Sequence, residues 1–582
     1  MKKITFFLLS IALAGLISCK NSTSTYKDIT EAKGNGVIYF GGEILTMTGD
    51  TPNYAEAVWV KDGKIAYIGS LEEAKKQGKG AELANLEGKT LLPSFIDAHS
   101  HYINSLTVSD QANVSPSPIT NGKGDNVDQI ISTIKQLKDK GNIPKDSLIQ
   151  AYGYDDTKMP NGRLLNRDDL DKAFPDNPVV VGHISMHGAV LNSKALTRFN
   201  ITKDTPTPKG GVIVRDENGE PYGLIMEMAY LPVFDNLPKP DSIQQIAWSK
   251  RGQMLYAEAG ITTAHDGATK FNDLEIMKNA NKANVNMIDI IAFPFIGDLK
   301  SILAKYPRKD WLKYDNHLKI GGVKITIDGS PQGKTAYFKD PYLTGSPSDK
   351  NDKNWRGELT FSQDEITAMV ALVYGMNVPL NLHANGDAAI DAFLKAHETV
   401  AKNDLGKERH VTMIHSQFVR NDQLKKYPEY KIFPSFYTLH TYYFADAHIK
   451  NRGRAQTDYM SPMKDAIGLG LKPTNHTDFV VLPLNQMMVL WSSVNRVSYG
   501  QQSIGPDQRI TPYQGLQAIT IHPAIQYMEQ DSKGTLEKNK LADLVILDKN
   551  PLKGDKMSIK DIKVLQTIKE GKVIYCKECN KS

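Results

Sequence analysis

The sequence predicts an α/β protein that consists of a (β/α)8 barrel, a small β-sandwich formed by both termini, and a subdomain inserted after the first barrel strand. Three observations lead to this prediction. Apolar strand patterns alternate with helical patterns through the middle of the chain, and β-rich segments lie at both ends. In addition, about 140 residues separate the first two strand patterns of the middle, which is too many for a loop. A chain of 582 residues can accommodate all three parts.

The middle of the chain supplies the strands of the predicted barrel. Strand patterns follow the opening run, Leu91–His101. Helical patterns such as Gln363–Tyr374 and Ala388–Ala401 separate them, and this alternation is typical of parallel βα units. Eight strands with intervening helices is the count of a (β/α)8 barrel. The seven later strand patterns are Ile261–Asp266, Val285–Phe295, Leu318–Asp328, Val378–Asn385, His410–Gln417, Lys431–His440 and Leu471–Phe479.

Strand patterns also occur near both ends of the chain. Val37–Met47 and Ala55–Gly69 predict strands, and the second range contains Asp62-Gly63, a strong hairpin signal. Ala542–Asp548 and Val564–Tyr575 predict further strands near the other end. One β-sandwich built from both termini is the economical interpretation, and two separate β-pieces are the alternative. We therefore expect a β-sandwich over 35–90 plus 530–582, a barrel over 91–102 plus 241–529, and an inserted subdomain over 103–240 that covers the barrel mouth.

The first residues predict an export signal. Lys2 and Lys3 precede the apolar stretch Ile4–Ile17, which is too short for a comfortable transmembrane helix. Leu16-Ile17-Ser18-Cys19 resembles the bacterial lipobox, in which cleavage leaves a lipidated cysteine at the N-terminus; an ordinary signal peptide is the alternative. We expect a signal peptide over 1–19, lipidation of Cys19 and a flexible tether over 20–34. The product would be an exported, membrane-anchored lipoprotein, in the outer membrane or facing the periplasm.

Composition excludes some other classes. The net charge is only +5 and the lysines are scattered, so no nucleic-acid partner is predicted. After the N-terminal signal no apolar run is long enough to span a bilayer, so membrane contact is expected only through lipid on Cys19. Cys576 and Cys579 form a Cys-X-X-Cys without two further zinc ligands nearby, which favours a local disulfide or two free thiols.

Candidate metal ligands lie at the ends of the predicted barrel strands. His99 and His101 are two positions apart, so in a strand both imidazoles point to the same side. Neutral imidazole is a common ligand of divalent metals. Lys324 lies within an apolar strand, where a buried ammonium is costly unless it is neutralised or paired. Because barrel enzymes place their chemistry at the carboxyl ends of strands, the set also includes three residues at later strand ends: His383, His415 and Asp478.

Together these motifs resemble the amidohydrolase superfamily, and within it the amidohydrolase-3 group. The resemblance extends from about Val37 to the C-terminus. The insertion fits the group as well, through Asn166–Asp171, His187 and Glu227. The most specific motifs are the Pro93–His101 run, Val323-Lys324 followed by Asp328-Gly329-Ser330, Leu382–Asp387, and Gly534-Thr535 leading to Lys540–Asp543.

This resemblance implies a distorted TIM barrel with a β-sandwich and one or two divalent metal ions, most commonly zinc. In two-metal members the lysine is carbamylated and bridges the ions, which would apply here to Lys324. One departure is Ile414, which stands where the group commonly has glutamate. The implied ligands are His99, His101, Lys324, His383, His415 and Asp478, and the residues expected to contact substrate are Asp328, His440, His476 and His187. For His476, orientation of Asp478 or a place at the rim are the alternatives.

The expected reaction is hydrolysis of a carbon–nitrogen bond by a metal-activated hydroxide, with Asp478 as general base and then general acid. The expected substrate is a small non-peptide amide, either an N-acyl or an N-formyl compound. A cyclic amide, a deaminated ring or an ester would fit the same site. A third interpretation is a non-catalytic, tethered binding lipoprotein, whose signature would be the loss of one or more ligands.

Overall fold

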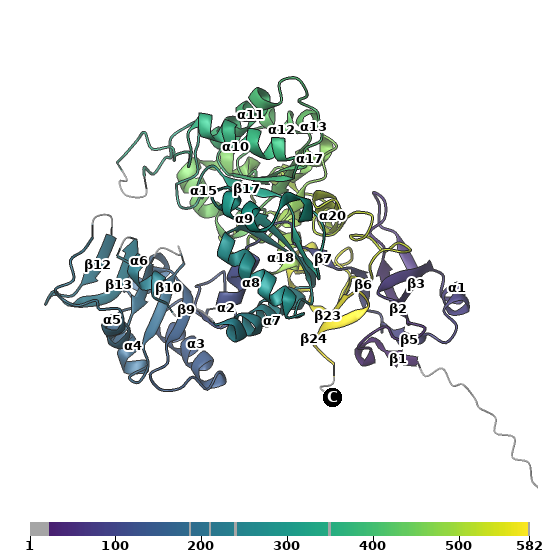
Figure 1. The fold of residues 1–582 in the computed structure, drawn as a ribbon, viewed down its shortest axis with the longest axis horizontal. Coiled ribbons are helices and arrows are strands. Elements are labelled where there is room, and N and C mark those ends of the chain that lie inside the picture. The colour runs from purple at the N-terminus through teal and green to yellow at the C-terminus, as the bar shows by residue number, and fades with distance from the viewer. Residues whose placement is uncertain are drawn as a thin grey trace, which may run out of the picture.

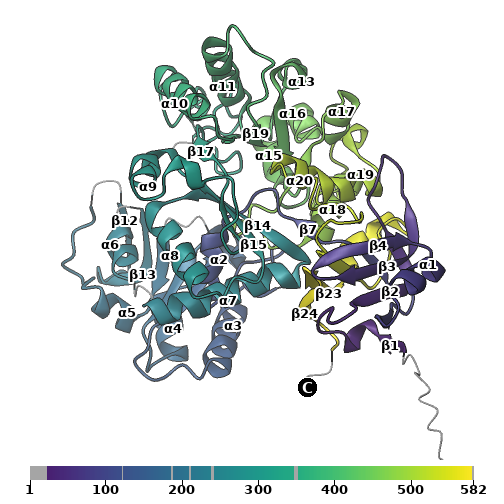
Figure 2. The same ribbon diagram turned by 45° about the vertical axis from the view of Figure 1, so that its right-hand side comes forward.

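The computed structural model describes residues 23–120, 122–184, 188–208, 211–227, 229–237, 241–346 and 351–579. Its elements form an α/β protein with four sheets. Figures 1 and 2 show the sheet built from both termini on one side, the inserted subdomain on the other, and the parallel strands between them. No helix in these ranges is long and apolar enough to cross a membrane. The expected signal peptide and Cys19 lie outside the described residues.

Both ends of the chain contribute to one nine-stranded sheet, shown by the purple and yellow strands of Figure 1. Strand β6 runs parallel to β2 and antiparallel to β22, so early and late segments are neighbours. Buried side chains from both ends, such as Tyr39 and Leu544, share one core. The strands are β1 (Thr23–Thr25), β2 (Val37–Leu45), β3 (Tyr54–Lys61), β4 (Lys64–Gly69), β5 (Glu82–Asn85), β6 (Thr90–Pro93), β22 (Leu544–Leu547), β23 (Val564–Lys569) and β24 (Lys572–Cys576), with helix α1 (Leu71–Gln77) beside them.

Two sequence-based boundaries are wrong. The flexible tether expected over 20–34 is in part ordered, because β1 pairs with β5 and Tyr26 and Ile29 are buried in the terminal core. These two apolar side chains outweigh the polar composition around them. The run Leu91–Pro93 was assigned to the barrel but belongs to β6 of the terminal sheet. The next short strand, β7 (Phe95–Ile96), is the first to pair with the parallel strands of the middle.

Parallel strands in the middle of the chain form two sheets. The first has the order β16-β15-β14-β7 and the second the order β17-β18-β19-β20-β21. A parallel bridge between Phe295 and Lys324 joins them where Gly321 and Gly322 interrupt one strand. A side chain at Gly322 would place its Cβ 2.3 Å from the carbonyl oxygen of Pro379. The strands are β14 (Ile261–Thr269), β15 (Asp289–Pro294), β16 (Leu318–Ile320), β17 (Val323–Thr326), β18 (Leu380–Ala384), β19 (Val411–His415), β20 (Ile432–Phe436) and β21 (Thr474–Asn475).

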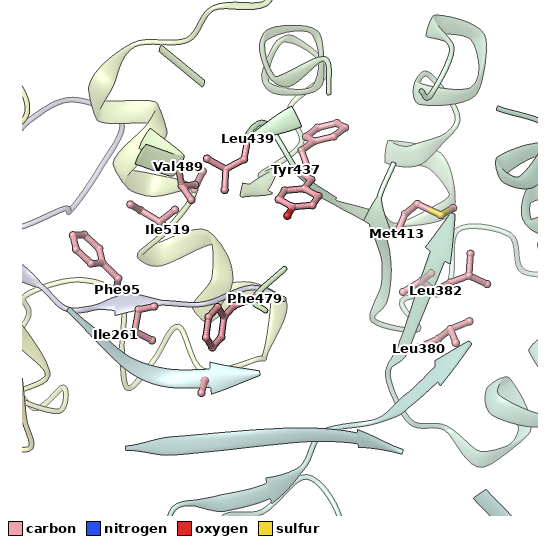
Figure 3. Packing of buried hydrophobic residues seen from close by; sticks show 14 of the residues in the cluster. Phe95, Ile261, Leu380, Leu382, Met413, Tyr437, Leu439, Phe479, Val489 and Ile519 are labelled. Carbon is pink, nitrogen blue, oxygen red and sulfur yellow. The ribbon is translucent and has the colours of Figure 1, made fainter. Parts of the chain in front are cut away.

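Backbone hydrogen bonds tie the first of these strands to the segment that follows the last. The Asp478 amide donates to the His99 carbonyl at 3.1 Å, and the His101 amide donates to the Phe479 carbonyl at 2.7 Å. The two sheets also share one large apolar core. Figure 3 shows part of it, with Phe95 from the first sheet and Met413 from the second. The expected strand Leu471–Phe479 is shorter than predicted, since β21 covers only Thr474–Asn475, but the residues after it lie against the segment that follows β7 and carries both histidines.

Helices connect most of the parallel strands. The predicted helix near Gln363 begins where a Ser362–Glu365 capping box satisfies free amides at its first turn. Its end is capped by Asn377 in the left-handed conformation. The helices are α7 (Ser242–Glu258), α8 (Phe271–Lys282), α9 (Leu299–Lys305), α10 (Gln363–Met376), α11 (Asp387–Val400), α12 (Asn421–Leu424), α13 (Tyr427–Tyr430), α14 (His440–Tyr443), α15 (Ala445–Arg452), α16 (Arg454–Tyr459), α17 (Met463–Gly468), α18 (Gln486–Asn495), α19 (Pro512–Gln517) and α20 (Ile521–Gln526).

The insertion has a sheet and a core of its own. Helix α2 (Tyr102–Val108) leads into it, and a six-stranded sheet follows in the order β12-β13-β11-β10-β9-β8. Buried residues such as Ile134 and Val181 form a core separate from that of the middle sheets. The elements are β8 (Ala112–Asn113), α3 (Val127–Lys140), β9 (Ile149–Tyr154), α4 (Arg167–Ala173), β10 (Val179–His183), β11 (Gly188–Leu191), α5 (Ser193–Arg198), β12 (Gly211–Arg215), β13 (Pro221–Glu227) and α6 (Leu231–Asp235).

The two cysteines near the end of the chain form a disulfide. Cys576 is the last residue of β24, and its sulfur is bonded to that of Cys579. Of the two interpretations left open by the sequence, the structure contains the local disulfide.

Candidate metal centre

Three predicted ligands come together beyond the end of β7. The Nε2 atoms of His99 and His101 each lie 3.4 Å from Oδ1 of Asp478. One nitrogen or oxygen atom from each residue lies within 4.8 Å of the other two. The His99 side chain is 1% exposed and that of His101 is 28% exposed, so the group is reached from the side of His101. This donor set, two imidazoles and a carboxylate, is typical of sites for zinc-like ions.

Lys324 lies in the same cluster. Its Nζ is buried and has no hydrogen-bond partner among the residues that the structure describes. Burial lowers the pKa of Lys324 to about 7, although the Asp478 carboxylate acts in the opposite direction. The lysine charge in turn lowers the pKa values of His99 and His383, an effect that adds to their burial. An isolated ammonium among imidazoles is costly, and either neutralisation or carbamylation would remove that cost.

His383 and His415 complete the predicted ligand set on neighbouring strands β18 and β19. Their ring centroids are 4.5 Å apart, and that of His415 is 5.4 Å from that of His99. Burial lowers the pKa of His383 to about 3 and that of His415 well below its ordinary value. Both rings are therefore neutral at physiological pH, which is the form that binds a metal. The six predicted ligands thus surround one region, with Lys324 inside β17 and the other five at or beyond strand ends.

His101 differs electrostatically from the other imidazoles. Burial disfavours its charged form, but the Asp478 carboxylate 3.4 Å from Nε2 outweighs burial and raises the pKa of His101. Its Nδ1 lies 2.7 Å from the Gly267 carbonyl, to which it can donate only when that nitrogen carries the proton. The Gly267 contact therefore fixes the ring so that Nε2 faces Asp478.

A second layer of side chains holds the imidazole of His99. Nδ1 of His265 lies 3.2 Å from Nδ1 of His99, and Nε2 of His265 lies 2.9 Å from Nδ2 of Asn381. His265 is fully buried on β14, and Asn381 lies on β18 two residues before His383. Asn381 was missed, although its spacing from His383 places both on the same side of the strand.

His476 holds His415 in a similar way. Its Nε2 lies 3.1 Å from Nδ1 of His415, and its Nδ1 lies 3.0 Å from the Ser435 hydroxyl. Both ring nitrogens are thus engaged, and the residue is fully buried. It is therefore not a rim histidine. The structure places it beside a predicted ligand, and Ser435 is a supporting residue that the sequence did not single out.

Asp328 is turned away from the open side of the cluster. Its side chain is fully buried, and its carboxylate accepts hydrogen bonds from the backbone amides of Tyr337, Asn385 and Gly386 at 2.8–3.0 Å. Burial raises the pKa of Asp328 to about 7, although these amides favour the charged form. One carboxylate oxygen lies 3.5 Å from Nε2 of His383. This carboxylate therefore shapes the loop after β18 next to a predicted ligand.

Two predicted substrate contacts remain, His440 and His187, and the structure describes only the first. His440 is buried, its Nδ1 lies 3.0 Å from Nε2 of His448, and its ring packs 4.6 Å from that of Tyr437. It thus lies next to the histidine cluster. His448 holds the ring of His440 in place. His187 lies outside the described residues.

A cavity of about 410 Å³ borders the open side of His101. Apolar side chains from several elements line it, including Ile103 of α2, Phe234 of α6 and Trp248 of α7. Phe234 is 54% exposed and belongs to the insertion. Two other groups of potential ligand atoms occur in the described ranges, Asp155 with Asp156 and His183, and Asp289 with His317 and Glu570. Neither contains a residue of the predicted set.

Known proteins resemble this chain over most of its length. The chain is 26% identical to the protein YtcJ of Bacillus subtilis (strain 168), over 92% of this chain and 99% of that protein. It is 24% identical to N-substituted formamide deformylase of Arthrobacter pascens, over 90% of this chain and 95% of that enzyme. An uncharacterized metal-dependent hydrolase from Pyrococcus horikoshii OT3 has the same fold, with a TM-score of 0.70 and 22% identity over 89% of this chain and 99% of that chain.

The family comparison covers most of the molecule. The sequence profile of the amidohydrolase family matches residues 82–575, which include the cluster of histidines with Lys324 and Asp478. Within that range, His99, His101 and Asp478 form a donor set that could hold a divalent metal ion. The chain therefore belongs to the amidohydrolase family and is a metal-dependent hydrolase that acts on carbon–nitrogen bonds.

Proposed function

We propose that the protein hydrolyses a non-peptide amide bond of a small N-acyl or N-formyl compound. One observation carries this proposal: His99, His101 and Asp478 converge at one point, where Asp478 Oδ1 and Lys324 Nζ lack hydrogen-bond partners among the described residues. Buried polar atoms without partners are rare unless a ligand completes them. The similarity to an N-substituted formamide deformylase supports an amide as the substrate class.

The architecture belongs to the same proposal. We interpret the two parallel sheets as one distorted (β/α)8 barrel, because they are connected at both ends. The β-bridge between Phe295 and Lys324 connects them at one end, and backbone hydrogen bonds near His99 and His101 connect them at the other. We interpret the nine-stranded sheet as a small β-sandwich around its shared core. In such a barrel the candidate ligands are at the carboxyl ends of the strands, where barrel enzymes carry their chemistry.

The residues present fit one or two divalent ions, for which zinc is the best candidate. His99, His101, His383, His415 and Asp478 would provide nitrogen and oxygen ligands. The buried imidazoles of His99, His383 and His415 are neutral, so no proton has to be removed from them at neutral pH. Lys324, if carbamylated, would provide a shared carboxylate. When bound, such an ion supplies a hydroxide near neutral pH and polarises a carbonyl group.

The proton transfers are assigned to Asp478. Its Oδ1 lies 3.4 Å from both imidazoles, and the side chain is 12% exposed, so it borders both the cluster and its open side. As general base it accepts a proton from the attacking water, and as general acid it returns this proton to the departing nitrogen. The carbon–nitrogen bond breaks, and a carboxylic acid and an amine are released.

Surrounding residues orient these groups. Asp328 positions His383 through the loop amides it binds, and His476 positions His415. We therefore assign both to positioning rather than to direct substrate contact. His440, packed beside Tyr437, is retained as a substrate-facing residue. Fixed outer partners of this kind preserve ligand orientation and metal affinity.

The insertion contributes to substrate selection. Phe234 and Trp248 line the cavity beside His101, and its wall contains both apolar and polar side chains. An apolar group on the substrate would occupy this cavity while the amide lies at the ligand cluster. This assignment gives the insertion a role at the barrel mouth through α6.

The protein is also proposed to be a lipoprotein anchored through Cys19 and facing the periplasm or located in the outer membrane. The lipobox-like Leu16–Cys19 sequence supports this proposal. Replacement of Cys19 by Ser should move the protein from the membrane fraction to the soluble fraction. If the wild-type chain is itself soluble and carries no lipid by mass spectrometry, the anchoring proposal is wrong.

A direct test uses protein that lacks residues 1–19. Metal content is measured after incubation with zinc or manganese, and hydrolysis is screened with N-formyl and N-acyl amines, cyclic amides and esters. We expect bound metal and turnover of at least one open-chain amide. If the protein binds metal but hydrolyses only cyclic substrates or esters, the proposal about which bond is cleaved is wrong. Failure to bind metal would contradict the hydrolase mechanism.

A further inference from the structure

Tyr437 has a buried hydroxyl group that bonds to none of the residues described by the structure. It directly follows β20 at the carboxyl end of that strand, and it is 1% exposed. Its hydroxyl oxygen has no hydrogen-bond partner among the residues that the structure describes. A buried phenol normally finds a partner, since its hydroxyl otherwise loses hydration without compensation. Phenylalanine would fill the same space without this cost.

Three imidazoles surround the Tyr437 ring. The Tyr437 ring packs against the imidazoles of His440, His476 and His415, with centroid distances of 4.6, 4.9 and 5.8 Å. Two of these rings lie at the ligand cluster and one lies on the proposed substrate side. Burial raises the pKa of Tyr437 well above its ordinary value, and the charge of Asp478 raises it further. The phenol is therefore a neutral donor within electrostatic reach of Asp478.

We propose that the Tyr437 hydroxyl donates a hydrogen bond to the substrate carbonyl oxygen as that oxygen gains negative charge, which makes Tyr437 a further catalytic residue. This inference rests on the proposed amide hydrolysis. The attack of water converts the carbonyl into an oxyanion, and a preorganised donor in a water-poor site stabilises that charge more than the neutral carbonyl. The same hydrogen bond would give the buried Tyr437 hydroxyl a partner.

Other nearby groups are less suited to this task. Nδ1 of His440 is engaged with His448, and both nitrogens of His476 are engaged with His415 and Ser435. Asp478 accepts protons in the proposed reaction. Among the groups described around the cluster, the hydroxyl of Tyr437 is thus a neutral donor that has no other partner.

The test is Tyr437→Phe, which retains the ring and its packing. Tyr39→Phe is the matched control, because Tyr39 is also fully buried with an unpartnered hydroxyl but lies in the terminal sheet. For Tyr437→Phe we expect kcat to fall about 100-fold or more, the size of effect seen when one oxyanion donor is removed. KM and zinc content should change little. Tyr39→Phe should retain wild-type turnover.

A second readout does not require turnover. Acetohydroxamate, whose anionic oxygen imitates the developing oxyanion, is titrated calorimetrically into zinc-loaded wild-type protein and both variants. Tyr437→Phe should weaken its binding about tenfold or more, a loss that corresponds to one hydrogen bond to charge, and Tyr39→Phe should not. If no amide is hydrolysed by the wild-type protein, the proposed function fails while this titration still tests the donor. Equal hydroxamate affinity, or equal kcat, in Tyr437→Phe and wild type would overturn the inference.

Discussion

Nδ1 of His415 lies 3.1 Å from Nε2 of His476, and the far side of the His476 ring lies 3.0 Å from the Ser435 hydroxyl. A predicted metal ligand is thus held by a second imidazole that is itself held by a serine. Such a chain fixes which nitrogen of His415 carries the proton and leaves its other nitrogen for a metal.

Replacement of His476 by alanine should therefore weaken metal binding. We expect zinc affinity to fall about 10- to 100-fold, the usual effect of removing an outer partner of a ligand. Competition with a chromophoric chelator measures this change. His397→Ala is the control, since His397 is equally buried but bonds to Tyr374 on the outer helices. An unchanged zinc affinity in His476→Ala would remove His476 from its positioning role.

Asp478→Asn separates proton transfer from metal binding. The amide keeps an oxygen that can coordinate a metal, but it cannot accept the proton of water. We expect zinc to remain bound while kcat falls by a factor of about 100 to 10,000, the contribution of a general base. Steady-state kinetics with parallel metal analysis decides the matter, and near-wild-type turnover in the zinc-loaded variant would exclude Asp478 as the base.

Lys324 should destabilise the metal-free protein at neutral pH. Burial lowers the pKa of Lys324 to about 7, whereas a lysine in the unfolded chain titrates near about 10.4. The unfolded state therefore binds more protons between these values, so stability should rise with pH across this window. Lys324→Met should raise the free energy of unfolding of metal-free protein at pH 7 and flatten its rise toward pH 10, as measured by urea unfolding. A parallel pH dependence in both proteins would contradict this account, and a carbamylated lysine would appear as an added mass in the wild type.

Asp289 should stabilise the junction between the terminal sheet and β15. Its Oδ2 accepts from Lys533 at 2.6 Å and from Lys569 at 2.8 Å, and all three side chains are buried. Burial alone would raise the pKa of Asp289, but the two lysine charges outweigh it and hold the pKa well below its ordinary value. In Asp289→Asn the two buried ammonium groups lose a negatively charged partner, so we expect the free energy of unfolding to fall by about 3–5 kcal/mol.

The stability of the protein at acidic pH provides a second test of Asp289. Because its folded-state pKa is depressed, its contribution is complete above the unfolded value of about 3.9 and is lost as the pH falls through the folded-state pKa. The loss of stability caused by Asp289→Asn should therefore shrink below about pH 4. Asp146→Asn, which removes the exposed partner of Lys194, should change stability little. An Asp289→Asn effect as small as this control would contradict the assignment.

Phe234 offers a test of the insertion. It is largely exposed yet lines the cavity beside His101. Phe234→Ala should raise KM for amides with a bulky apolar group by about 10-fold, as expected from the apolar contact area lost. N-formyl compounds with small amines should be unaffected. Ile243→Ala, at another exposed apolar residue near the start of α7, provides the control. Equal KM changes for large and small amides would exclude the cavity as a specificity site.

His383, His415 and Asp478 could be predicted from the sequence because each ends an apolar strand pattern, whereas Lys324 could be predicted because it is a charged residue within one. His383 and His415 could be placed side by side, since neighbouring parallel strands bring their carboxyl ends together. The strand near Asp478 was predicted too long because its backbone turns into a loop after Asn475. Tether and barrel boundaries were also misplaced, since Tyr26 and Leu91 pair with partners far away in the chain.

Supporting residues were harder to predict. Asn381 was detectable from its alternation with His383, but Ser435 and Tyr437 look like ordinary residues at the end of a strand. Their role depends on the distance of a hydroxyl group from imidazoles contributed by other strands. Such distances arise from tertiary packing, which one sequence does not reveal.

The position of β6 between β2 and β22 imposes an order on chain maturation. During synthesis, the strand that leads directly to His99 and His101 has one of its two neighbours at once, but the other emerges more than 400 residues later, at Leu544–Leu547. Until then one edge of β6 stays open, and exposed strand edges favour association between chains. A ribosome-bound chain that stops before β22 would thus contain every candidate ligand. It would still lack the second neighbour of β6, the strand that precedes the segment with His99 and His101.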